Sequence, residues 1–203
     1  MKRFAVLLTL AVAMVLVAPI SHGTPYAVRL TGANEIPANN SPATGFGVVD
    51  FSTTTHLLTV NINFGGLTGT TTAAHIHCCV TTPGTNAGVA TTVPTFPNFP
   101  LGVTSGTYNV TLDMTQASTW NPAFLTANGG TPAGAEAALA AAILAGSQAY
   151  LNIHTTTFPG GEIRSFLLSE ADRGVPTLSE WTLGALALLL IAIGFVMLRR
   201  RTT

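Results

Sequence analysis

Charged residues are scarce in this sequence, and lysine is almost absent. Only 8% of the 203 residues are charged. Residues 24–174 contain three arginines, no lysine and seven acidic residues, which gives this region a net charge of −4. Because a basic surface is needed to neutralise phosphates, we do not expect this region to bind nucleic acid or to adhere to anionic lipid. The other positive charges lie near the two ends of the sequence.

Cysteine is nearly absent as well, and the two cysteines, Cys78 and Cys79, are adjacent. A network of disulfides therefore cannot stabilise the fold, and the core must be stabilised by packing. A bond between neighbouring cysteines departs from ordinary disulfide geometry. The sequence leaves four states open: a vicinal disulfide, an intermolecular bridge, free thiols or soft metal ligands.

Familiar catalytic motifs are also missing. The sequence has no Gly-x-Ser-x-Gly, no phosphate-binding loop, no His-Glu-x-x-His and no dinucleotide-binding glycine pattern. Carboxylates are too sparse to indicate a glycosidase. A cysteine nucleophile is disfavoured, because on a strand only Cys79 would share the face of His77. We therefore expect the protein not to be an enzyme.

The first 23 residues have the pattern of a secretory signal peptide. Lys2 and Arg3 precede an uncharged apolar run over residues 4–18, and the small residues Ser21 and Gly23 follow. Cleavage after Gly23 would make residue 24 the first of the mature chain. A retained membrane anchor is the alternative, but the apolar run is shorter than the ~20 residues that a spanning helix needs.

Residues 181–198 form a second apolar segment, WTLGALALLLIAIGFVML, without a charge. As a helix this segment would extend about 27 Å, which is just enough to cross a bilayer. Three arginines follow directly, at 199, 200 and 201. The positive-inside rule then places the basic tail, residues 199–203, in the cytoplasm and residues 24–170 outside.

A linker and a short motif, residues 171–180, precede the apolar segment. The motif consists of Val175, Pro176, Thr177, Leu178, Ser179, Glu180 and Trp181. Together with the apolar segment and the arginines, it resembles the IPTL-type C-terminal sorting signal of Gram-negative bacteria, which has isoleucine in the place of Val175. The resemblance implies recognition by an exosortase-like enzyme, cleavage near the motif and delivery to the cell surface. A plain single-pass anchor is the alternative.

Alternating apolar and polar residues predict an antiparallel β domain between the two ends. The clearest example is residues 56–64, where Leu58, Val60, Ile62 and Phe64 share one face. Further strands are expected near residues 26–31, 45–51, 72–77, 107–114, 149–154 and 162–168. One alanine-rich segment, residues 134–145, predicts a short helix. We expect an all-β Greek-key sandwich or barrel with one helical insertion, followed by a C-terminal transmembrane helix.

Three histidines are candidates for a metal site. On a strand, His75 and His77 would lie on one face, about 7 Å apart at Cα, which lets two rings share one ion. His154 follows Ile153 in a second strand. If the isoleucines mark the core, all three histidines face outward, and they converge only if the two strands are neighbours. The alternatives are a solvated polar face or hydrogen bonds to loop backbone.

A carboxylate could orient one of these rings from behind, and Glu162 and Asp50 are the candidates. His56 begins a strand and is expected at the surface, whereas His22 leaves with the signal peptide.

Ordered motifs over residues 25–168 resemble the CHRD domain, a module named after chordin. These motifs are Leu-Thr-Gly-Ala-Asn-Glu-Ile-Pro from residue 30, Ala-Thr-Gly from 43, Phe-Gly-Gly-Leu-Thr-Gly from 64, Ala-Ala-His-Ile-His from 73, Tyr-Leu-Asn-Ile-His-Thr from 150 and Pro-Gly-Gly-Glu-Ile-Arg from 159. The family usually has a glycine soon after His-x-His, where this chain has Cys78 and Cys79. The resemblance implies an extracellular β domain without an established enzymatic activity. Chordin itself is a secreted binder of growth factors, a ligand that a bacterium would lack.

A looser similarity is to copper/zinc superoxide dismutase, where a Gly-Leu stretch also precedes a His-x-His strand. The other ligands of that enzyme have no clear counterparts here, so we do not expect its activity. The analogy favours a metal site.

These observations lead to two main hypotheses of function. The first is an exported, surface-sorted, non-enzymatic binding or structural module of a Gram-negative cell envelope, with an unknown extracellular ligand. The second is an envelope metalloprotein that binds copper or zinc through His75, His77 and His154. A third is an adhesin joined through an intermolecular bridge at Cys78 or Cys79.

Overall fold

The computed structural model describes residues 24–168, 184, 186–191 and 193. The expected signal peptide (1–23), the linker and sorting motif (171–180) and the basic tail (199–203) lie outside these residues, as does most of the apolar segment 181–198. Within the described part of the chain, no helix is long and apolar enough to span a membrane.

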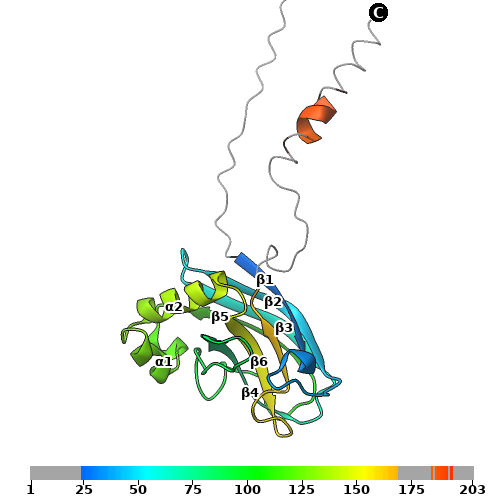
Figure 1. Ribbon diagram of the computed structural model, residues 1–203, viewed down its shortest axis with the longest axis vertical. Coiled ribbons are helices and arrows are strands. Elements are labelled where there is room, and N and C mark those ends of the chain that lie inside the picture. Colours follow the sequence, from blue (N-terminus) through cyan, green and yellow to red (C-terminus); the bar gives the residue numbers. More distant parts are fainter. Residues whose placement is uncertain (1–23, 169–183, 185, 192, 194–203) are drawn as a thin grey trace, which may run out of the picture.

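Seven antiparallel strands form one curled sheet, which resembles half a barrel (Figure 1). The order across the sheet is β4-β6-β7-β1-β2-β3-β5. The strands are β1 (Thr24–Thr31), β2 (Thr44–Ser52), β3 (Leu57–Gly65), β4 (Thr71–Cys78), β5 (Gly106–Asp113), β6 (Ala149–Thr155) and β7 (Ile163–Phe166). The antiparallel β class and all seven predicted strands are therefore confirmed.

The expected sandwich or closed barrel is not what the chain forms. The described strands make a single sheet with two edges, β4 and β5. Helices and a long loop, rather than a second sheet, cover its inner face. Alternation along a strand shows that one face is buried, but it does not show what covers that face.

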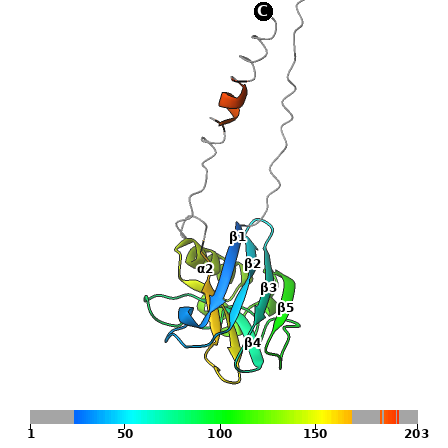
Figure 2. The ribbon, with the colours of Figure 1, turned by 90° about the vertical axis from the view of Figure 1, so that its right-hand side faces the viewer.

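Two α-helices lie on the inner side of the sheet, opposite the face that β1, β2, β3 and β5 turn outward (Figure 2). The predicted helix is α2 (Pro132–Leu144), capped by Thr131, whose side chain accepts a hydrogen bond from Gly134 N. The sequence analysis missed α1 (Pro122–Ala127) and two short 3-10 turns, η1 (Gly32–Asn34) and η2 (Ala117–Thr119). These elements have three to six residues, too few to show a helical period.

The core fills the space between the curled sheet, α2 and the loop over residues 79–105. Leu58, Val60 and Ile62 of β3 are fully buried on the inner face, as are Leu139 of α2 and Phe96 of the loop. The loop joins α2 in covering the sheet, so its apolar side chains contribute to the core. This packing takes the place of the second sheet that was expected.

The loop over residues 79–105 also covers the outer edge of β4. Ala90 N and Phe96 N donate to the carbonyls of Ile76 and Ala74, at 2.9 and 3.1 Å. Thr91 Oγ1 in turn accepts from Ile76 N at 3.0 Å. The edge strand is thereby paired and protected from other chains, and the loop is fixed directly beside the histidines of β4.

Candidate metal centre

The sheet brings the three histidines together because β4 and β6 are neighbours. His154 of β6 lies opposite Ala73, and His75 of β4 lies opposite Asn152. One ring nitrogen from each of His75, His77 and His154 lies within 4.8 Å of the others. The ring centroids are 5.3 to 5.8 Å apart. The convergence that the sequence left open is therefore present in the fold.

The three histidines project away from the core, as expected, but the face of the sheet on which they lie is not solvated. Ile76 and Ile153 are fully buried on the core side, and the histidines project from the opposite face of the sheet. Loops cover this face, so the exposed fractions of His75, His77 and His154 are only 5%, 7% and 9%. A solvated polar face is thus excluded.

Each ring is held by a backbone carbonyl on one of its two nitrogens. The contacts are His75 Nε2 to Pro94 O at 2.7 Å, His77 Nδ1 to Ala87 O at 3.0 Å and His154 Nδ1 to Pro159 O at 2.9 Å. Because a carbonyl only accepts, each of these nitrogens must carry the proton. Neutral rings therefore have lone pairs on His75 Nδ1, His77 Nε2 and His154 Nε2. Metal-binding histidines commonly have this arrangement, with the second nitrogen donating to a carbonyl.

The remaining nitrogens are poorly satisfied by the protein alone. His77 Nε2 lies 3.1 Å from His154 Nε2, so two lone pairs face each other. His75 Nδ1 is buried and has no hydrogen-bond partner among the described residues. Burial lowers the pKa of His75 and of His77 to about 4, and it also lowers the pKa of His154. At pH 7 the rings are therefore neutral, and a shared proton does not resolve the contact.

Among the described residues, no carboxylate forms a hydrogen bond with these rings, contrary to the suggestion for Glu162 and Asp50. Glu162 is fully buried but accepts hydrogen bonds from Ser41, Thr68 and Thr155 instead. His56 is half-exposed, as expected, and its Nδ1 contacts Glu136 at 2.8 Å. Three backbone carbonyls from two loops take the role that the sequence analysis gave to carboxylates.

Comparison with protein families places the whole β domain in one of them. A family model described as the CHRD domain matches residues 26–167. The chain belongs to the CHRD-domain family. A second model, described as the IPTL-CTERM motif, matches residues 173–201. Both resemblances noted in the sequence are thereby confirmed, and the sorting signal identifies an exported, envelope-associated protein that an exosortase-type system processes. Comparisons with curated proteins and with solved structures found no significant match.

In the CHRD domain, Tyr150 and Arg164 form a stack with His77, and the sequence analysis did not identify them as site residues. The ring of Tyr150 stacks on His77, with centroids 4.9 Å apart and an interplanar angle of 4°. Its hydroxyl oxygen accepts from Ala87 N at 3.1 Å. The Arg164 guanidinium carbon lies 4.4 Å from the centroid of the Tyr150 ring. Period-two alternation from His154 back to Tyr150 is a signal that would have placed Tyr150 on this face.

Arg164 is itself fixed by a buried ion pair. Its Nε donates to Glu35 Oε2 at 2.6 Å, and its Nη2 donates to Asn86 Oδ1 at 2.7 Å. Arg164 and Glu35 are 1% and 5% exposed. Nothing local in the sequence pairs these two residues, because 129 positions separate them.

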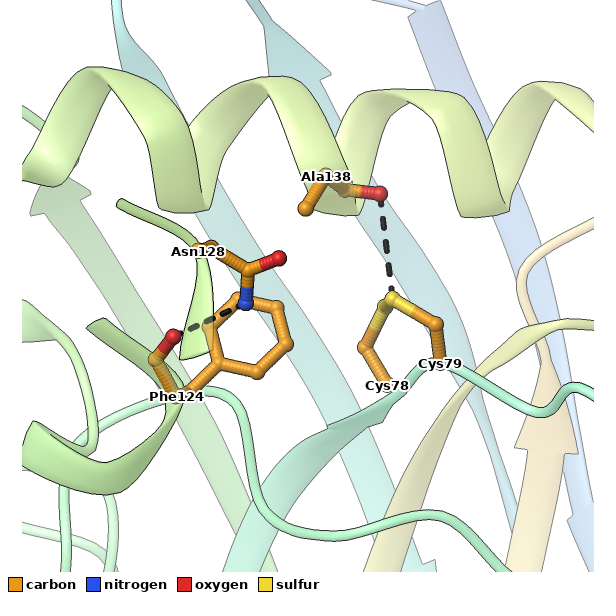
Figure 3. Close-up of a disulfide and its surroundings, with 5 residues drawn as sticks. All are labelled: Cys78, Cys79, Phe124, Asn128 and Ala138. Carbon is orange, nitrogen blue, oxygen red and sulfur yellow. Dashed lines mark hydrogen bonds between the residues drawn. A yellow bond between two sulfur atoms is a disulfide. The ribbon is translucent and has the colours of Figure 1, made fainter. Parts of the chain in front are cut away.

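The two cysteines of the CHRD domain directly follow His77 in the sequence and are bonded to each other. Of the four states left open by the sequence, the structure has the vicinal disulfide between Cys78 and Cys79. Figure 3 shows it beneath α2, where Cys79 Sγ lies 3.8 Å from the Ala138 carbonyl oxygen. Both cysteines pack in or against the hydrophobic core. The expectation that Cys79 shares the histidine face is therefore wrong, because strand β4 ends at Cys78 and strict alternation ends with it.

Proposed function

We propose that this exported CHRD-domain protein is a non-enzymatic, metal-binding module of the cell surface. In this proposal His75, His77 and His154 bind one copper or zinc ion. The observation that carries it is the 3.1 Å approach of His77 Nε2 to His154 Nε2. Both nitrogens have lone pairs, because the other nitrogen of each ring donates to a carbonyl. A cation between the rings turns this repulsive contact into a favourable one.

The geometry of the cluster is close to what an imidazole-bound ion requires. Zinc lies about 2.0–2.1 Å from each histidine nitrogen, which places two ligand nitrogens of one ion roughly 3 to 4 Å apart. The distance between His77 Nε2 and His154 Nε2 is within that range, and one ring nitrogen of His75 lies within 4.8 Å of both residues' ligand nitrogens. Imidazole ligands suit copper and zinc. The carbonyl contacts orient the rings before the ion arrives, which lowers the cost of binding.

A binding role without turnover is supported by the absence of a catalytic motif in the sequence and by the burial of all three rings. We further propose that residues 1–23 direct export, and that residues 181–198 hold the precursor in the membrane of a Gram-negative cell. Cleavage near the motif Val175–Trp181 would then release the mature protein to its final position.

The direct test is metal analysis of the full chain, expressed with export and purified in detergent. We expect about one copper or zinc per chain after loading and desalting. Substitution of His75, His77 and His154 by alanine should abolish this uptake. His56→Ala, which changes a half-exposed histidine outside the cluster, is the matched control and should retain the metal. A folded wild-type chain that takes up neither metal, or equal uptake by the triple variant, would refute the proposal.

A further inference from the structure

The candidate ligands of this site are all uncharged. Within the described residues, the cluster contains three histidines and neither a carboxylate nor a thiolate. The two cysteines form a disulfide, so neither provides a thiolate. In sites that contain carboxylates or thiolates, these ligands offset part of the charge of the ion. Here the ion would keep its full charge in a nearly dry site.

A positively charged group, the guanidinium of Arg164, lies against Tyr150, the ring that stacks on His77. Arg164, Tyr150 and His77 form a stack, with the guanidinium carbon 4.4 Å from the Tyr150 centroid and the two ring centroids 4.9 Å apart. The carboxylate of Glu35 lies on the other side of the guanidinium and is paired with it.

Burying an ion costs free energy that grows with the square of its charge. For ions of similar size, the cost of a divalent ion is about four times that of a monovalent ion. The Arg164 guanidinium, whose charge the paired Glu35 carboxylate partly offsets, adds a repulsion that is also larger for the divalent ion. Of the ions that imidazole binds well, copper in its reduced state is monovalent.

We propose that the three-histidine site selects Cu(I) over Cu(II) and Zn(II), because its neutral ligands and the neighbouring Arg164 disfavour a divalent charge. This inference rests on the proposed function, since it names the oxidation state of the ion that the same residues bind. Its failure can be distinguished from the failure of metal binding. A site that binds zinc or Cu(II) at least as tightly as Cu(I) refutes the selectivity and leaves the metal-binding function intact.

The test measures the affinities of the full chain for Cu(I) and Cu(II). Cu(I) is kept reduced with ascorbate under nitrogen and competed with bicinchoninate, and Cu(II) and Zn(II) are competed with a chromogenic chelator. Ascorbate does not reduce disulfides, so the bond between Cys78 and Cys79 stays intact. We expect Cu(I) to bind at least about a hundredfold more tightly than Cu(II), because the additional unit charge of Cu(II) raises the cost of burial. Equal or tighter binding of Cu(II) would overturn the inference.

Two isosteric variants test whether charge causes the preference for Cu(I). One should lower the affinity ratio of Cu(I) to Cu(II), and the other should raise it. Asn152→Asp places a carboxylate directly opposite His75 in the sheet, and should reduce the affinity ratio of Cu(I) to Cu(II) about tenfold or more at pH 8. Glu35→Gln leaves the charge of Arg164 uncompensated and should raise the ratio. Asn61→Asp, on the exposed face of β3, is the matched control and should not change it. Ratios that stay unchanged in both buried variants would show that charge does not set the preference.

Discussion

At the scale of single residues, hydrogen bonds to backbone determine what the histidines can do. The sequence pattern was enough to place His75 and His77 on one face. It could not identify the carbonyls of Ala87, Pro94 and Pro159 as their partners, because backbone groups carry no side-chain signature. The error about Glu162 has a different cause: its partners, mainly side-chain hydroxyls, come from three separate segments of the chain.

Glu162 gives a prediction about stability and pH. Burial raises the pKa of Glu162, but hydrogen bonds from Ser41, Thr155 and Thr68 outweigh this effect, so the net pKa is below its usual value. A group with a lowered pKa in the folded state stabilises the protein above its unfolded pKa. That contribution is lost as the pH falls through the folded pKa.

We therefore expect Glu162→Gln to lower the free energy of unfolding at pH 7 by about 1–3 kcal/mol. The deficit relative to wild type should shrink as the pH falls through the lowered pKa of Glu162 in the folded protein, because wild-type Glu162 is then protonated as well. Denaturant unfolding at several pH values measures this. Asp113→Asn, at a fully exposed carboxylate, is the control and should have a smaller effect. A deficit that is constant with pH would contradict the argument.

At the scale of elements, the strands could be predicted from the sequence, but the segments that cover the sheet could not. Alternation in residues 56–64 led directly to β3, because its inner face is buried along its whole length. The loop over residues 79–105 has no comparable period, yet it pairs with β4 and carries two of the three carbonyls that hold the histidines. An edge strand completed by a loop has no local signal in sequence.

Thr91 tests whether this loop is attached to the sheet as described. Its Oγ1 accepts from Ile76 N at 3.0 Å, and the side chain is fully buried. Thr91→Val removes the acceptor and leaves a buried N–H without this partner, so the free energy of unfolding should fall by about 1–3 kcal/mol. Thr59→Val removes a hydroxyl from the exposed pair with Thr111 and should cost less. Equal losses in both variants, measured by denaturant unfolding, would argue against the attachment.

At the scale of the whole molecule, the two regions that match family models have separate roles. The CHRD domain over residues 26–167 contains the histidine cluster, and the sorting motif over residues 173–201 sets the location. Both were recognisable from ordered motifs in the sequence. The adjacency of β4 and β6 was not, because 70 residues separate them and alternation contains no information about strand order.

If binding and sorting are independent, each can be removed without the other. Deletion of residues 173–201 in a host with an exosortase-type system should abolish retention at the envelope, because the signal that the system recognises is gone, while the secreted chain still binds metal. Alanine at His75, His77 and His154 should do the opposite, with normal envelope location and no metal. Fractionation with immunodetection, combined with elemental analysis of each fraction, distinguishes the cases. Mislocalisation of the triple variant, with the domain still folded, would show instead that metal loading is required before the protein is sorted.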